Sequence, residues 1–155
     1  MIPALIESHL KQHHLGYVHH HHRPASTAQD LAAAEHVTGH CVAKPVVLRM
    51  GEQPAIAVVS AAQRVRLSAL EEATGLPVEL VPESEFAEWF APCENGAEPP
   101  LSVFGLPILV DARIAGEERL LMPGGTHEDS ILLDTGEWMR CEAVQTIPDL
   151  GAPMH

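Results

Sequence analysis

Two neighbouring apolar runs joined by a turn do most to constrain how this chain folds. Residues 42–49 are rich in valine and other aliphatic side chains, which favours a buried β-strand. Residues 51–54, Gly-Glu-Gln-Pro, have the composition of a turn, and residues 55–60 are again mostly apolar. The pattern therefore predicts a β-hairpin, around which the other elements must be arranged.

Lys44, one of two lysines in the chain, lies inside the first of these runs. An ammonium group among apolar neighbours loses hydration, so it needs an anionic partner or a lowered pKa. That requirement makes Lys44 a candidate site residue. The alternative is that Lys44 lies at the start of the strand and extends its charged end into water.

Length and composition indicate one globular domain over residues 1–155, with residues 149–155 expected to be peripheral. The chain has 155 residues, of which 46% are hydrophobic, enough for a core without disulfides. No apolar run approaches the ~20 residues of a membrane span. The net charge of −12 argues against nonspecific binding to a long phosphate backbone, but the nine Lys and Arg residues could hold a small polyanionic end.

Irregular alternation of helical and strand patterns predicts an α+β fold around a mixed β-sheet, not a doubly wound one. Ser26 is expected to cap a helix, and Gly75 to end the next one. Helices are expected at residues 2–15, 27–37, 62–74, 83–90 and from an N-cap at Asp134 to just before Pro148. Strands are expected at residues 17–21, 42–49, 55–60, 78–81, 106–111, 118–122 and 131–133.

The cysteines and the first residues indicate a cytoplasmic protein with reduced thiols. Cys41, Cys93 and Cys141 are odd in number, far apart and without a CxxC pair. Residues 1–8 show neither a basic region nor a long apolar stretch, so no signal peptide is expected. Cys93 or Cys141 could be a nucleophile only with a histidine close in space, and the alternative is a small core or loop thiol.

Four consecutive histidines, His19 to His22, raise the question of a metal site. They continue a predicted strand, whose alternation would point two imidazoles to each face. A structural zinc site needs four ligands with loop-like spacing, and the helical pair His36 and His40 lacks a carboxylate to complete it. We therefore expect no specific metal site and no cofactor, and interpret the run as a solvated, pH-sensitive face that binds nickel or zinc only adventitiously.

Two loops are better candidates for chemistry than any hydroxyl group, because no GxSxG elbow occurs. Residues 96–100, Gly-Ala-Glu-Pro-Pro, begin with glycine and end in prolines that stiffen the backbone. Such a loop can present peptide N–H groups to a carbonyl oxygen or carboxylate, as an oxyanion hole does. Residues 124–127, Gly-Gly-Thr-His, likewise follow a strand with flexible glycines and an imidazole. Taken alone, either loop could be an ordinary turn.

Five stretches in order along the chain carry a family resemblance. They are residues 26–32 (STAQDLA), 43–44 (AK), 93–100 (CENGAEPP), 105–111 (GLPILVD) and 125–127 (GTH). Together they resemble the YbaK/ProX family of free-standing aminoacyl-tRNA deacylases, which is related to the editing insertion of bacterial prolyl-tRNA synthetase. No single stretch is specific, but five in sequence are hard to obtain by chance.

The resemblance implies a mixed, partly barrel-like β-sheet surrounded by helices. It also implies trans-editing, the hydrolysis of the ester that joins a wrong small amino acid to the 3′ end of a tRNA, for example tRNA-Pro. The family lysine, here Lys44, contacts the terminal nucleotide, and the GxxxP loop from Gly96 positions the ester carbonyl. In the family no metal is required, and the substrate's own 2′-OH is thought to help activate water. Because an aminoacyl ester is already activated, positioning and oxyanion stabilisation can suffice without a protein nucleophile.

The resemblance also implies which residues form the site. The catalytic residues would be Lys44, Gly96 and His127, with His127 as a wall of the pocket or a hydrogen-bonding partner of the α-amino group or water. The substrate-binding residues would be Thr27, Ala97, Glu98, Pro99, Pro100, Gly125 and Thr126. The expected partner is the acceptor end of a mischarged tRNA, and an aminoacyl-tRNA synthetase is a further candidate partner.

Three positions depart from the family pattern and leave the substrate open. Pro45 stands where alanine-specific members often have asparagine, Asn95 where proline is common, and Pro123 where asparagine is common. Ala, Ser, Thr, Cys or a non-proteinogenic residue are all compatible substrates. Two other hypotheses remain: a non-catalytic module of the same fold that binds an amino acid, nucleotide or protein, and a histidine-based metal binder. The oligomeric state stays open.

Overall fold

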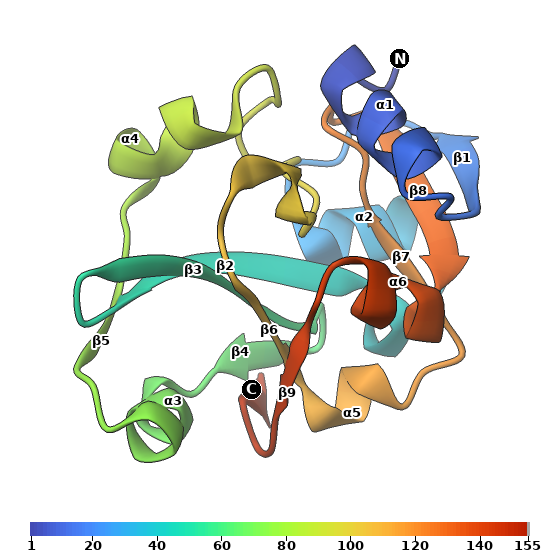
Figure 1. The fold of residues 1–155 in the computed structure, drawn as a ribbon. Helices are drawn as coiled ribbons and strands as arrows, with labels where there is room; N and C mark the ends of the chain where they lie inside the picture. The colour runs from blue at the N-terminus through green and yellow to red at the C-terminus, as the bar shows by residue number, and fades with distance from the viewer. Residues whose placement is uncertain (155) are drawn as a thin grey trace.

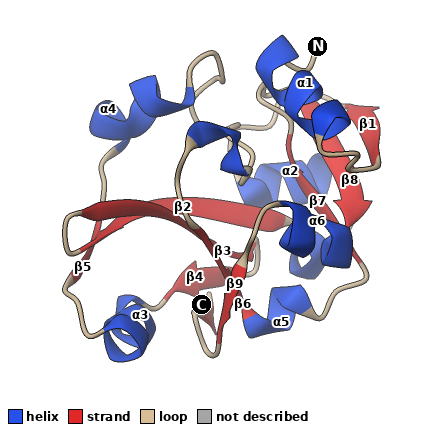
Figure 2. Ribbon diagram, viewed as in Figure 1, coloured by secondary structure: helices blue, strands red, loops and turns tan. Residues whose placement is uncertain are grey.

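The structure, a computed structural model, describes residues 1–154 (Figure 1). Helices and strands alternate irregularly, and helices lie on several sides of the sheets (Figure 2). The helices are α1 (Ala4–Gln12), α2 (Ala28–Ala34), α3 (Leu67–Thr74), α4 (Glu83–Phe86), α5 (Ala112–Ala115) and α6 (Thr135–Cys141), with 3₁₀ turns η1 (Gly39–Cys41), η2 (Ala87–Phe90) and η3 (Ser102–Phe104). The strands are β1 (Tyr17–His21), β2 (Ala43–Met50), β3 (Gln53–Ser60), β4 (Gln63–Val65), β5 (Val78–Leu80), β6 (Ile108–Asp111), β7 (Arg119–Pro123), β8 (Asp129–Asp134), β9 (Gln145–Ile147) and β10 (Gly151–Pro153).

The predicted hairpin forms the middle of a five-stranded sheet with the order β5-β2-β3-β6-β9. β2 and β3 are antiparallel and pair along their whole length, whereas β6 lies parallel to β3. Alternate residues of β3 face two different cores: Ile56 and Val58 pack into one, and Ala57 and Val59 into the other. This burial on both faces explains why the strand is almost continuously apolar.

A second, three-stranded sheet, with the order β1-β8-β7, stands beside the first. It is antiparallel throughout, and helix α1 lies next to it (Figure 1). A bridge between Val42 and Leu121 joins the two sheets just before β2 begins. The α+β prediction with a mixed sheet is therefore confirmed, although the strands of residues 1–154 do not close into a barrel.

Three predicted elements differ in the structure. The last helix, expected to run to just before Pro148, ends at Cys141, and residues 145–147 form strand β9 instead. The helix expected at residues 62–74 begins only at Leu67, because residues 63–65 form strand β4. That strand pairs with β10 near the C-terminus. The expectation that residues 149–155 are peripheral is accordingly wrong for the part that the structure describes, since Leu150 is fully buried and β10 is part of a sheet.

Two of the three predicted helix ends are confirmed and one is displaced. Gly75 ends α3 in the left-handed conformation. Asp134 caps α6, and its carboxylate accepts a hydrogen bond from the Glu137 amide at 2.8 Å. Helix α2 is capped not by Ser26 but by Thr27, whose hydroxyl oxygen accepts from the Asp30 amide at 3.0 Å. Within residues 1–154, none of the helices combines the length and apolar character needed to span a bilayer.

Candidate active site

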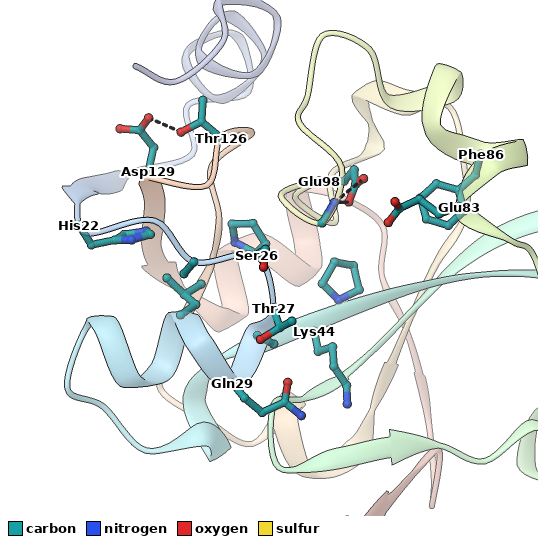
Figure 3. A pocket seen from close by; sticks show the side chains of 16 residues that line it. His22, Ser26, Thr27, Gln29, Lys44, Glu83, Phe86, Glu98, Thr126 and Asp129 are labelled. Atoms are coloured by element: carbon teal, nitrogen blue, oxygen red, sulfur yellow. Dashed lines mark hydrogen bonds between the residues drawn. The ribbon is translucent and has the colours of Figure 1, made fainter.

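A cavity of about 300 Å³ opens where the start of α2, the start of β2, helix α4 and two loops meet (Figure 3). One loop is residues 91–100, and the other is the β7–β8 connection at residues 124–128. The cavity is lined by His22, Ala25, Ser26, Thr27, Ala28, Gln29, Leu31, Lys44, Pro45, Glu83, Phe86, Gly96, Glu98, Pro123, Thr126 and Asp129. This is the size of a small ligand site, since such sites usually measure ~300–1,000 Å³.

The backbone conformation of Gly96 allows the 91–100 loop to form part of the cavity wall. Its φ of +87° lies in the left-handed region, and a Cβ atom there would stand 2.6 Å from the carbonyl oxygen of Ser26. Glycine is therefore required both by conformation and by close approach. The tight contact also places the loop directly against the residues that precede α2.

His127 and Glu94 fasten this loop to the β7–β8 connection. The His127 Nε2–H donates to the carbonyl oxygen of Asn95 at 2.6 Å, and the His127 amide donates to the Glu94 carboxylate at 2.7 Å. The Gly125 amide donates to the carbonyl oxygen of Ala97 at 2.8 Å. His127 does not line the cavity, so the expectation that it forms a wall of the pocket is not met; its contacts join the two loops instead.

Glu98 places a buried carboxylate at the cavity. The side chain is 7% exposed, and both of its oxygens accept from the Gly96 amide at 3.1 Å. Burial raises the pKa of Glu98 above its usual range, and the nearby carboxylate of Glu83 raises it further, against the lowering effect of backbone amides and His127. The loop amide expected to hold a substrate carbonyl is thus bound here by the protein's own carboxylate.

Lys44 lines the same cavity but points its ammonium group away from the 91–100 loop (Figure 3). The Nζ atom donates to the carbonyl oxygen of Gln63 on β4, and the sulfur of Met154 lies 3.5 Å away. Because the ammonium is half-buried without a carboxylate partner, desolvation lowers the pKa of Lys44 below its usual value.

The other walls come from Thr27, Thr126 and Asp129. Thr126 donates its hydroxyl to the Asp129 carboxylate at 2.5 Å, and His19 and the terminal ammonium of Met1 also contact that carboxylate. Burial by itself would raise the pKa of Asp129, but these hydrogen bonds outweigh it and hold the pKa well below its usual range. Through these hydrogen bonds, the Asp129 carboxylate connects β1 to the turn beside the cavity.

The cavity brings together half of the residues implied by the resemblance. Thr27, Lys44, Gly96, Glu98 and Thr126 line it. The remaining ones, His127, Ala97, Pro99, Pro100 and Gly125, do not. Ala97 and both prolines are buried in the loop's own packing, and Gly125 lies under helix α1, where a Cβ would meet Pro3 at 2.6 Å.

Several residues that line the cavity could not be predicted from the sequence. Glu83 and Phe86 come from α4, a short element whose place beside the cavity depends on long-range packing. His22 is buried, and its Nδ1–H donates to the carbonyl oxygen of Arg23 at 2.6 Å, while Nε2 has no partner within residues 1–154. The histidine run gave a signal at this position, but it suggested a solvated face. Its other members face carboxylates: His19 and His21 contact Asp129, and His20 contacts Glu35.

A second hollow adjoins the cavity at Lys44. This basic groove, of about 640 Å³, is lined by Lys44, Val46, Arg64, Val65, Arg66, Leu67, Ser68 and Leu80. Within residues 1–154, none of its three cations forms a salt bridge, although Arg66 donates to the carbonyl oxygen of Asp149 at 3.0 Å. A third of the nine Lys and Arg residues therefore gather on one side of an acidic protein.

Comparison with known proteins assigns the family. A profile of the aminoacyl-tRNA editing domain matches residues 22–141, which is most of the chain and includes the whole cavity lining. The chain belongs to the aminoacyl-tRNA editing domain family. A search of curated proteins finds no significant match for this editing domain. In the described part of the editing domain, residues 1–154, no group of three or more His, Cys, Asp or Glu side chains is placed to hold a metal ion.

Solved structures share the fold of the editing domain. The hypothetical protein APE2540 superposes with a TM-score of 0.86 at 18% identity, covering 96% of this chain and 99% of the other. A protein described as a candidate trans-editing enzyme for prolyl tRNA synthetase gives 0.76 at 21% identity, covering 96% and 98%. A candidate signal transduction protein from Marinobacter aquaeolei VT8 gives 0.74 at 16% identity, covering 98% of this chain but 31% of the other.

Proposed function

We propose that this editing domain hydrolyses the ester bond of a mischarged aminoacyl-tRNA in trans. The observation that carries the proposal is the shared cavity, in which Lys44 and Thr27 stand on the same small hollow as Gly96, Glu98 and Thr126. The family assignment supports an aminoacyl-tRNA substrate. A hollow of about 300 Å³ suits a small aminoacyl group better than a whole nucleotide.

The reaction needs a water molecule and a polarised carbonyl. The water oxygen attacks the ester carbon, the bond to the ribose oxygen breaks, and the proton lost by water is returned to that oxygen as a hydroxyl group. The amino acid leaves as its carboxylic acid, which releases the second proton of the water to solvent and becomes a carboxylate. The Gly96 amide is the donor for the developing oxyanion once the Glu98 carboxylate moves aside. No nucleophilic side chain is required, because the ester is already activated and its position is fixed.

The tRNA end would lie in the basic groove that begins at Lys44. Arg64 is exposed and Arg66 half-buried, and apolar side chains such as Leu80 and Val46 also line the groove. The paired N–H groups of an arginine guanidinium bind phosphate oxygens, and bases stack on apolar or planar surfaces. This groove therefore suits a single-stranded 3′ end. The net charge of −12 restricts contact with the rest of the tRNA. A small amino acid on tRNA-Pro remains the specific substrate that we propose, and an aminoacyl-tRNA synthetase is the protein partner to test.

A panel of mischarged tRNAs tests this function. Wild-type protein is expected to release small amino acids from at least one of them, and Lys44→Ala to lose most of that activity while keeping a native circular dichroism spectrum. Lys11→Ala is the matched control, because Lys11 pairs with Glu7 on the surface of α1. Absence of turnover across the whole panel would contradict the proposal.

A non-catalytic binding module of the same fold is the second candidate. Two observations favour it: the Gly96 amide is occupied by Glu98, and one protein of this fold is a much longer chain described as a candidate signal transduction protein. In that case an aminoacyl-adenosine amide analogue would bind in the cavity, whereas the corresponding esters would be returned unchanged.

A further inference from the structure

One end of the cavity carries two carboxylates and no cation. We call Glu83 and Glu98 the acidic wall. Both line the cavity, and Figure 3 shows them at the same end of it, on the side opposite to the ammonium group of Lys44. Within residues 1–154, no Lys, Arg or His nitrogen lies within 4.0 Å of either carboxylate.

A buried carboxylate without a cationic partner lowers the stability of the folded protein. Glu98 is 7% exposed, and it is held by neutral backbone amides, chiefly that of Gly96, with His127 acting on it only from beyond ion-pair distance. Buried charges in proteins are normally paired or fully hydrogen-bonded, because desolvation otherwise outweighs what they gain. A carboxylate has about four acceptor positions, so Glu98 retains capacity on the side that faces the cavity. Such an arrangement points to a cationic partner that arrives from outside.

The two ends of the site therefore have opposite charge. Lys44, Arg64 and Arg66 line the basic groove at one end, and the acidic wall closes the other. An amino acid esterified to a 3′-terminal nucleotide has the same polarity, with phosphates on one side of the ester and an α-ammonium group on the other. The charge pattern matches this molecule in only one orientation.

We infer that the acidic wall, through Glu98 above all, receives the α-ammonium group of the aminoacyl ester. This inference rests on the proposed function and adds a selection rule to it. Substrates whose α-nitrogen is acylated carry no charge there, and they leave the buried carboxylate without its partner. The site thus discriminates by the state of the α-amino group as well as by side-chain size.

Binding of two non-hydrolysable probes tests the inference directly. The first is 3′-deoxy-3′-(L-alanylamino)adenosine, and the second is the same compound with its α-nitrogen acetylated. The wild type is expected to bind the free amine about tenfold or more tightly, the usual effect of a charged hydrogen bond. Equal affinity for the two probes, or no binding of the free amine at millimolar concentration, would overturn the inference.

Glu98→Gln separates charge from shape. The glutamine carbonyl can still accept from the Gly96 amide, so the loop keeps its hydrogen bond while the negative charge is lost. The variant is expected to bind both probes about equally. Glu88→Gln, which removes an exposed carboxylate on η2 outside the cavity, should retain the wild-type preference. A Glu98→Gln protein that still favours the free amine as strongly as the wild type would disprove the assignment.

Hydrolysis assays distinguish failure of the inference from failure of the proposed function. The substrates are RNA minihelices charged with alanine or N-acetylalanine. Equal hydrolysis of both by the wild type would remove the inference and leave the deacylase function standing. Hydrolysis of neither, with no turnover across the whole panel of mischarged tRNAs and a clear binding preference for the free-amine probe, would remove the deacylase function and leave the ammonium site.

Discussion

At the residue scale, burial of the Glu98 carboxylate lowers the stability of the fold, although we propose that the same carboxylate binds substrate. The raised pKa means that the folded protein holds the Glu98 proton more tightly than the unfolded chain does. By linkage, stability is then lost as the pH rises from the unfolded pKa through the folded one. Glu83 and His127, which act on Glu98 in opposite directions, modulate this window.

Glu98→Gln should therefore raise the melting temperature at pH 7.5, although it removes a residue proposed to bind substrate. The gain should shrink as the pH falls and disappear near pH 3, well below the ordinary pKa of glutamate, where the carboxyl group is neutral in both the folded and the unfolded state. Thermal unfolding of both proteins across this pH range checks the prediction. A destabilised variant at pH 7.5 would mean that the carboxylate gains more from the Gly96 amide than it loses by burial.

Gly96 and Gly105 offer a matched pair for the shape of the loop. Both have a positive φ, +87° and +77°, but a Cβ would meet the Ser26 carbonyl only at Gly96 and nothing within 4 Å at Gly105. Gly105→Ala should cost about 1–2 kcal/mol of stability from backbone strain alone. Gly96→Ala should cost more and abolish ester hydrolysis, because the backbone of Ser26 cannot yield without moving the start of α2. Urea unfolding and turnover of the best substrate measure both effects, and equal losses in the two variants would count against the close contact.

At the element scale, the β4–β10 pair supports the strand whose carbonyl oxygen binds the Lys44 ammonium group. The Arg66 amide donates to the carbonyl oxygen of Leu150 at 2.7 Å, and the Gly151 amide donates to Asp111 at 3.2 Å. Strand β4 also provides the carbonyl oxygen that binds the Lys44 ammonium group. The C-terminal segment therefore supports the site from behind.

Leu150→Ala should reduce the free energy of unfolding by about 2–5 kcal/mol, as expected for a large side chain removed from a packed core. Leu150 is fully buried, whereas Met154, at 46% exposure, gives the control variant Met154→Ala with little change. Chemical denaturation of both variants is the measurement. A loss below ~0.5 kcal/mol at Leu150 would show that the segment is dispensable after all.

Long or locally signalled elements could be predicted from the sequence, and short or distant ones could not. The β2–β3 hairpin, strand β1 and the Asp134 cap follow from patterns within a few residues. Strands β4 and β10 have three residues each and are defined by each other across the chain, so no local pattern marks them. The same holds in the site: Gly96 and Lys44 carry a signal in their neighbours, but the direction of the Lys44 ammonium and the role of His127 depend on packing.

At the scale of the whole molecule, an acidic protein presents one basic groove. Its three cations should neutralise about three phosphates of a single-stranded end and so release about two counterions, which gives a slope near −2 in a plot of log affinity against log salt. Arg64→Gln should weaken binding of an uncharged RNA hairpin ending in CCA and reduce the slope by about 0.7. Arg119→Gln, an exposed arginine on β7 outside the groove, is the control. Titrations at four salt concentrations decide, and a slope unaffected by Arg64→Gln would place the RNA elsewhere.

The carboxylate at the closed end of the cavity has a consequence for translation itself. During protein synthesis, a cell contains many tRNAs whose ester carries a growing peptide or a formylated initiator residue, and none of these has a free charged nitrogen next to the ester. A hydrolase that requires that charge leaves such intermediates intact. Glu98 would thus confine proofreading to single, freshly attached amino acids and protect unfinished chains from premature release.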